Sequence, residues 1–280
     1  MKPISPIRPS PIAGTWYDDN PKHLAAEIDG YLNDAVIPAV DGDVVALIAP
    51  HAGYRYSGTV AGHAFAAVRS MDFDLVAVLS PLHAYHPAPF ITSSHAAYQT
   101  PLGRIAIDRK AVSDLNRALI DELGFGLETI ARDGEHSLEI ELPFLQRALS
   151  SDFALLPIMI RSVDAGELEA LGNALANLLR GRNALIVAST DLSHFYHQHE
   201  ANLLDGEMLR QIEAFSPEGV LRAEETGKGF ACGRGAVAAT LFAARELGAD
   251  SVKVVNYATS GDVTGDMSSV VGYGAAAILK

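Results

Sequence analysis

Continuous apolar runs of strand length recur along the chain, separated by amphipathic stretches of helical length. The runs are continuous rather than alternating, which is typical of strands that a sheet buries on both faces. The pattern therefore predicts a largely parallel central sheet covered by helices. The apolar runs span 44–49, 74–80, 153–160, 184–190, 252–258 and 269–279.

The stretches between these runs carry helix-start signals. Asn20 stands before Pro21, and Ser216 stands before Pro217; proline is favoured in the first turn of a helix and Asn or Ser just before it. Strands that alternate with helices favour a three-layer α/β/α architecture. The helices are expected at 21–34, 58–69, 109–122, 137–149, 165–180, 200–214 and 233–247.

Composition gives no reason to divide the chain. Of its 280 residues, 49% are hydrophobic and 20% are charged, which supplies ample material for a core. There is no low-complexity linker and no fixed-period repeat. Since single α/β domains often reach ~250 residues, residues 1–280 are expected to form one domain.

Charge and hydropathy exclude several kinds of partner. The net charge of -13 would repel a phosphate backbone, so nucleic acid is not expected as a partner. The longest apolar runs fall short of the ~18 residues that span a bilayer, so no membrane partner is expected either. The N-terminal stretch is broken by prolines and lacks the apolar region of a signal peptide. The single cysteine, Cys232, fits a reducing compartment, and the cytoplasm is predicted.

Polar residues able to bind a metal follow three of the apolar runs. In open α/β sheets, ligands bind beyond the carboxyl ends of the strands, so residues far apart in sequence are expected to converge there. The run 44–49 is followed by His51, 74–80 by His83 and His86, and 184–190 by Asp191 and His194.

Cys232 precedes a strongly helical stretch, and a helix N-terminus favours the thiolate form of cysteine. Two imidazoles with one thiolate or carboxylate suit iron or copper, and zinc also accepts such ligands. The residue types alone leave the metal open.

Each candidate also has a structural interpretation without a ligand. A single histidine after a strand is often only hydrogen-bonded, and a lone cysteine is often a small buried apolar residue. His197 and His199 match no zinc spacing and fit an exposed loop. His136 follows Glu135 in what reads as the acid-rich first turn of a helix, and it is a candidate for the pocket wall.

Motifs of other chemistries are missing from the sequence. There is no GxxxxGK[ST] phosphate loop and no GxGxxG turn after a strand, so nucleotide sites lack their usual cradle. GxSxG and HExxH motifs are missing as well,.

The ordered set of motifs resembles the Memo family, known in prokaryotes as AmmeMemoRadiSam system protein B. The motifs span nearly the whole chain. They are PSPIAGTWY near the N-terminus, 49-APHAGYRYSG-58, 80-SPLH-83, 135-EHSLEIELPFL-145, 189-STDLSHF-195 and 231-ACGRGAV-237.

The resemblance implies a fold similar to class III extradiol dioxygenases of the LigB type. It also implies that His51, His83 and Cys232 line a metal pocket, with Asp191 and His194 beside it. The dioxygenases hold Fe(II) with two histidines and a glutamate, whereas this pattern places a cysteine in the third position. Because that change alters the softness and redox behaviour of the metal, ring cleavage does not follow from the fold.

The leading functional hypothesis is a redox protein dependent on iron (Fe2+) or copper. In it, His194, oriented by Asp191, moves a proton, while Tyr54, Arg55 and His136 orient a substrate. One alternative is a non-catalytic module whose pocket binds a peptide or a partner, as proposed for animal relatives, and another is an extradiol-type dioxygenase. The ligand of the pocket is expected to be a small molecule or a peptide. A third treats Cys232 as a metal-free thiol sensor. The family name suggests a radical SAM protein and a third component of that system as pathway partners.

Overall fold

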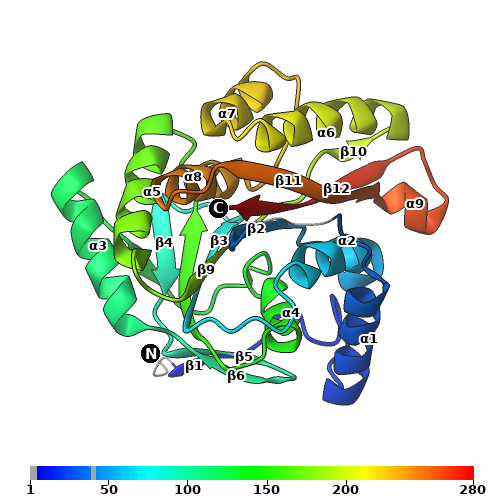
Figure 1. Ribbon diagram of the computed structural model, residues 1–280. Coiled ribbons are helices and arrows are strands. Elements are labelled where there is room, and N and C mark those ends of the chain that lie inside the picture. The colour runs from blue at the N-terminus through cyan, green and yellow to red at the C-terminus, as the bar shows by residue number, and fades with distance from the viewer. Residues whose placement is uncertain (1–4, 39–41) are drawn as a thin grey trace.

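A mixed nine-stranded sheet runs through the part of the protein that the computed structural model describes, residues 5–38 and 42–280 (Figure 1). Its strand order is β10-β12-β2-β9-β3-β8-β4-β7, and β11 pairs with β12. The strands are β2 (Val44–Ala49), β3 (Leu75–Pro81), β4 (Phe90–Ser93), β7 (Glu128–Ile130), β8 (Ala154–Ile160), β9 (Ala184–Ser189), β10 (His194–Tyr196), β11 (Ser251–Thr259) and β12 (Val270–Leu279).

The four central strands β2, β9, β3 and β8 are parallel, as their continuous apolar sequences predict. On either side the sheet becomes antiparallel: β12 runs against β2, and β4 against β8. Strands β11 and β12 also pair antiparallel along most of their length. Only residues 260–269 separate them, too few for the crossover of a dozen or more residues that parallel neighbours need. The sheet is thus parallel only over its four central strands, at whose carboxyl ends the site lies, and antiparallel where β12 and β4 join them.

Helices cover both faces of the sheet, which confirms the three-layer α/β/α prediction (Figure 1). Helix α2 packs on β2, β11 and β12, and α8 packs on β2, β3, β8 and β9 from the other side. One layer contains α1 (Pro21–Asp34), α2 (Tyr54–Ala66) and α4 (Glu141–Ala148). The other contains α3 (Arg109–Leu123), α5 (Ala165–Leu179), α6 (Gln198–Glu213), α7 (Pro217–Glu225) and α8 (Arg234–Glu246).

The predicted helices are present, with differences at some ends. Helix α2 begins at Tyr54 rather than at residue 58, and α4 begins at Glu141 rather than at 137. Residues 137–140 instead form a turn in which the Ile140 amide donates to the His136 carbonyl. Helix α7 was not among the expected helices, although Ser216 caps it by accepting a hydrogen bond from the amide of Gly219.

A second, small sheet pairs the N-terminal segment with a hairpin, and Arg8 on that segment contacts the loop before α4. Its strands are β1 (Ile7–Arg8), β5 (Ala97–Thr100) and β6 (Gly103–Ala106). These strands are too short to give a readable apolar pattern. The buried guanidinium of Arg8 pairs with Asp133 and Glu139 and donates to the carbonyl oxygen of Glu135. This network fixes the loop that carries Glu135 and His136.

No helix within the described ranges is long and apolar enough to cross a membrane. The prediction that the N-terminus is not a signal peptide concerns a stretch whose first residues, 1–4, lie outside the described residues.

Candidate metal centre

The carboxyl ends of the central strands bring together the polar residues that the sequence singles out. His51 follows β2, His83 follows β3, and Asp191 and His194 follow β9 or open β10. All four line one hollow of about 250 Å³, together with His136 and with the apolar or aromatic side chains of Trp16, Phe195, Val271 and Tyr273. We call it the histidine hollow.

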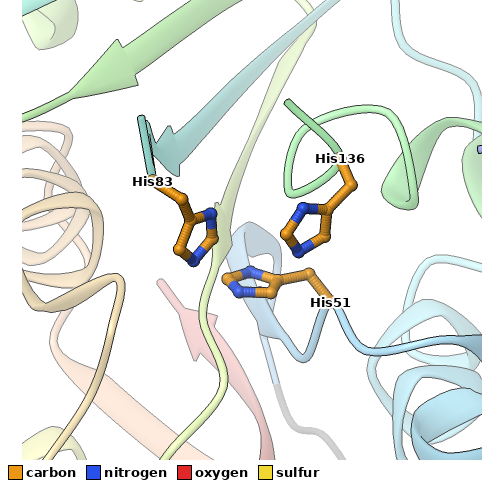
Figure 2. Close-up of side chains that lie close together, drawn as sticks. All are labelled: His51, His83 and His136. Carbon is orange, nitrogen blue, oxygen red and sulfur yellow. The ribbon is translucent and has the colours of Figure 1, made fainter. Parts of the chain in front are cut away.

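Three imidazoles gather at the floor of this hollow. Ligand nitrogens of His51, His83 and His136 all lie within 4.8 Å of one another, and Figure 2 shows the three rings around one small space. His51 is 1% exposed, whereas the side chain of His83 is 38% exposed and that of His136 is 19% exposed. The group is therefore anchored in the core and open on one side.

The ring of His51 is held from behind by Ser189. Its Nδ1 lies 2.9 Å from Ser189 Oγ, and that hydroxyl lies 2.7 Å from Glu141 Oε1 and 2.6 Å from the carbonyl oxygen of Ser137. Since the serine hydrogen is donated to one of these acceptors, Nδ1 of His51 donates to Ser189. Burial raises the pKa of Glu141 well above its usual range. The lone pair of His51 is thus directed from Nε2 toward the hollow.

The ring of His83 is oriented by Glu135. Its Nδ1 lies 2.9 Å from Glu135 Oε1, and its backbone amide donates to Glu135 Oε2 at 2.7 Å. Burial alone would raise the pKa of Glu135, but hydrogen bonds from His83 and Ser137 outweigh it and hold that pKa well below its usual range. The same hydrogen bond raises the pKa of His83. A carboxylate behind a histidine is the usual partner of a metal-binding imidazole.

His136 is stacked on the ring of His83 and lies tilted against the ring of Trp16. Its centroid lies 4.0 Å from that of Trp16 and 4.8 Å from that of His83, and its Nδ1 lies 3.4 Å from Glu135 Oε1. Burial lowers its pKa to about 4, so the ring is neutral near pH 7. The sequence placed His136 in the pocket wall; the structure places its nitrogen within reach of the other two imidazoles.

Cys232 lies beside this group. Its Sγ is 3.2 Å from His51 Nε2 and accepts a hydrogen bond from the Asp191 amide at 3.3 Å. Burial, followed by the nearby charge of Asp191, raises the pKa of the thiol. The expectation that the start of α8 favours the thiolate is therefore wrong for the chain without metal, because desolvation outweighs the helix end. Its role as a ligand stays a prediction.

Asp191 and His194 share the hollow but serve different neighbours. Asp191 Oδ1 accepts from the His51 amide at 2.7 Å, and Oδ2 lies 4.0 Å from His51 Nε2. Burial raises the pKa of Asp191 to about 7 and lowers that of His194. The His194 ring lies 5.2 Å from that of Phe230. Within residues 5–38 and 42–280 no hydrogen bond joins Asp191 to His194, so orientation of one by the other stays a prediction.

Other predicted residues lie apart from the imidazoles. Tyr54 is 2% exposed, and its hydroxyl donates to the carbonyl oxygen of Ile140 at 2.7 Å. Arg55 lines a different hollow, with Asp18 and Glu27. Their part in orienting a substrate stays a prediction. His197 and His199 are exposed, as expected, but only His197 precedes α6, as its N-cap, whereas His199 lies in the first turn of that helix.

Sequence reasoning missed the residues behind the histidines. Glu135 and Ser189 fall inside the segments 135–145 and 189–195 that marked the family, yet neither was predicted to hold a histidine ring. Glu141 offered a signal in the sequence, because it stands between the apolar residues Ile140 and Leu142. An acidic residue that such neighbours bury needs a polar partner. The first-turn interpretation of Glu135 is wrong, because α4 begins six residues later and the carboxylate holds His83.

The fold and site define an α/β protein whose histidine cluster, at the carboxyl ends of parallel strands and with His51 buried, could hold a metal. The donor chemistry fits such an ion, because two imidazoles have their Nδ1 atoms fixed by buried partners and the third is neutral. The profile described as Memo-like protein matches residues 8–277. The chain belongs to the Memo family.

Relatives agree over almost their full length. A MEMO1 family protein of Nitrosopumilus maritimus is 33% identical over 96% of this chain and 98% of its own. One from Methanococcoides burtonii is 36% identical over 98% of this chain and 100% of its own. Among solved structures, an uncharacterized protein from Escherichia coli K12 covers 84% of this chain and 99% of its own, with 11% identity and a TM-score of 0.43.

Proposed function

We propose that this chain is a metal-dependent redox protein whose histidine hollow holds iron or copper. Bound there, either metal would supply one-electron chemistry and open positions for a substrate. His51 and His83 are the central ligands in this proposal, because each has its Nδ1 engaged by a buried partner and so directs Nε2 into the hollow. That pairing of ring and partner is the observation that carries the proposal.

Cys232 and His136 compete for the remaining position. Ligand atoms on a tetrahedral ion with bonds of ~2.0–2.3 Å lie ~3.3–3.8 Å apart, and Cys232 Sγ lies 3.2 Å from His51 Nε2. Soft thiolate donors favour copper(I), iron or zinc. We assign Cys232 as the third ligand and His136 as a further donor on the open side. Binding of the metal would release the thiol proton, and the metal–thiolate bond would offset the cost that the raised pKa of the free thiol adds,.

His194 is the proposed proton carrier. Because burial lowers its pKa, the ring is neutral near pH 7 and able to accept a proton from a substrate in the hollow. Asp191 supports the site from the other side, by fixing the backbone of His51. The rings of Trp16 and Phe195 line the same hollow and offer apolar surface to such a substrate.

Metal content of variants tests the proposal. The protein is produced anaerobically and analysed for bound elements as wild type and as His51→Ala, His83→Ala, Cys232→Ser and His136→Ala, with exposed His199→Ala as the matched control. Near-stoichiometric iron or copper in wild type and control, lost in the first three variants, is expected. Wild-type protein that stays metal-free after reconstitution would sink the proposal, and bound zinc alone would remove its redox part.

A second candidate function is binding without catalysis. Phe195 beside the hollow is 76% exposed and has a φ of 65°, a conformation that costs an aromatic residue free energy and is often kept for function. Trp16 on the same rim is 36% exposed. These rings suit a peptide or an apolar ligand. A peptide that binds equally well to His51→Ala protein would favour this function.

The remaining assignments follow from the family resemblance. An extradiol-type dioxygenase would need a carboxylate ligand, and Asp191 Oδ2 at 4.0 Å from His51 Nε2 is the one carboxylate oxygen that the described residues place against this imidazole; oxygen-dependent cleavage of catechol by the iron-loaded protein tests it. A radical SAM partner is proposed on the same footing, and pull-down from cells of the source organism would test it. A reducing cytoplasm is proposed because Cys232 is the single cysteine of the chain,.

A further inference from the structure

A second hollow, of about 410 Å³, adjoins the histidine hollow at His83. It lies where β3 and β8 end and α8 begins. Among the residues that line it are His83, Arg161, Ser162, Cys232, Arg234 and Gly235. We call it the arginine hollow. Its volume falls within the ~300–1,000 Å³ of small-molecule sites.

The lining of the arginine hollow is positively charged, whereas the protein as a whole is negatively charged. The chain carries 34 acidic and 21 basic residues, yet the described residues that line the arginine hollow include two arginines and no carboxylate. By contrast, Arg55 shares its hollow with Asp18, Asp19 and Glu27. A water-filled space with guanidinium groups and no acid favours an anion.

Arg161 has no carboxylate to neutralise it within the described residues. Its guanidinium donates to the carbonyl oxygens of Leu82 and Ala84 at 3.1 and 3.4 Å, and it lies over the Tyr85 ring with 5.9 Å to the centroid. These contacts hold the group beside the loop of His83 without cancelling its charge. Both hydrogen bonds use Nη1, so the N–H groups of Nη2 and Nε remain to donate to an oxyanion of the ligand,.

Arg234 is placed by a partner behind it. Its Nη1 pairs with Glu224, whose Oε2 also accepts from the Ala231 amide. One carboxylate occupies only part of the five N–H donors of a guanidinium. The wall that carries Arg234 is tightly built: a Cβ on Gly235 would lie 2.6 Å from the Ser162 carbonyl oxygen. The start of α8 therefore sits directly against the end of β8.

We propose that the arginine hollow binds an anionic group, a carboxylate or a phosphate, with Arg161 as its main partner and Arg234 as the second. This proposal deepens the proposed function and rests on it for the role of the anion, which is to place a substrate beside the metal ligands His83 and Cys232. The substrate class is thus an acid whose uncharged part extends into the histidine hollow, since His83 lines both.

Calorimetric titration of the metal-loaded protein tests the site, with inorganic phosphate and acetate as separate probes and with sodium chloride to match ionic strength. The variants are Arg161→Gln, Arg161→Lys and Arg234→Gln. Arg104→Gln is the matched control, because Arg104 is likewise exposed and hydrogen-bonded to a neighbour, Gln99, but lies in a hollow that also contains Asp152.

Wild type and the control should bind one of the two anions, and the one bound identifies carboxylate or phosphate as the source. Arg161→Gln should weaken binding at least about tenfold, as loss of a charge-assisted contact does. Arg161→Lys keeps the charge but loses the bidentate donors of the guanidinium, so its affinity should lie between those of wild type and Arg161→Gln. Arg234→Gln should weaken binding as well, provided that its melting temperature shows a folded protein.

Binding of neither anion, or equal weakening in Arg104→Gln, would overturn the proposal. Unchanged binding in Arg161→Gln, which alters an exposed side chain and should fold normally, would overturn it too. Bound metal is measured on the same samples. Wild type that takes up no metal but still binds the anion through Arg161 would refute the proposed function and support the anion site. Wild type with full metal content that binds no anion would support the proposed function and refute the anion site.

Discussion

The sulfur of Cys232 lies 3.2 Å from Nε2 of His51, although 181 positions separate the two residues in the chain. His51 reaches this point from the loop after β2, and Cys232 reaches it from the turn before α8. The contact therefore brings the loop before α2 and the turn before α8 together at the carboxyl edge of the sheet.

Alkylation of Cys232 should be slow at neutral pH in metal-free protein. Burial raises the pKa of the thiol, so the reactive thiolate is scarce at pH 7 and increases only as pH rises beyond the ordinary value of ~8.5. Iodoacetamide labelling is followed by mass spectrometry between pH 6 and 10, with urea-unfolded protein as the control. Rapid labelling of the folded chain at pH 7, independent of metal, would instead support the thiol-sensor alternative.

Glu135→Gln should weaken metal binding about 10–100-fold, the usual effect of losing the partner behind a ligating histidine. The neutral amide no longer holds Nδ1 of His83 as a carboxylate does at 2.9 Å. Competition with a chelator of known affinity measures the change. The exposed Glu169→Gln protein serves as the control, and equal affinity in both variants would show that Glu135 does not support the site.

Arg8→Ala should lower the free energy of unfolding by about 3–5 kcal/mol, because removing one member of a buried ion pair leaves the other charges without a partner. The side chains of Arg8 and Glu139 are 3% and 0% exposed. The control Arg147→Ala breaks an ion pair with Asp29 that is 39% and 37% exposed, so less than about 1 kcal/mol is expected. Urea denaturation compares the two, and similar losses would contradict the buried network.

Two glycine-to-alanine changes should have opposite effects. A Cβ on Gly172 in α5 would lie 2.5 Å from Phe242 Cβ and 2.9 Å from the Ala239 carbonyl oxygen in α8, so overpacking of about 1–3 kcal/mol is expected. Gly206 in α6 has no such neighbour within 4 Å, and alanine there should stabilise by about 0.5–1 kcal/mol. Thermal unfolding followed by circular dichroism measures both; a stabilising Gly172→Ala would refute the close helix contact.

Sequence alone determined the layers and the edge of the sheet where the chemistry lies. Continuous apolar runs predicted the central strands, since strands covered on both faces cannot alternate. The order of strands and helices predicted the three layers. His51 and His83 could be located as well, because each follows a buried strand and parallel strands present their carboxyl ends together.

Only the tertiary structure decided which side chains meet. Glu135, Ser189 and Glu141 act on the imidazoles through hydrogen bonds whose lengths depend on how β9, α4 and the loop before α4 pack, and no local sequence pattern records that packing. The protonation state of Cys232 also depends on the tertiary structure. Its position before a helix predicts a thiolate, but desolvation by the surrounding strands and loops outweighs the local field of the helix,.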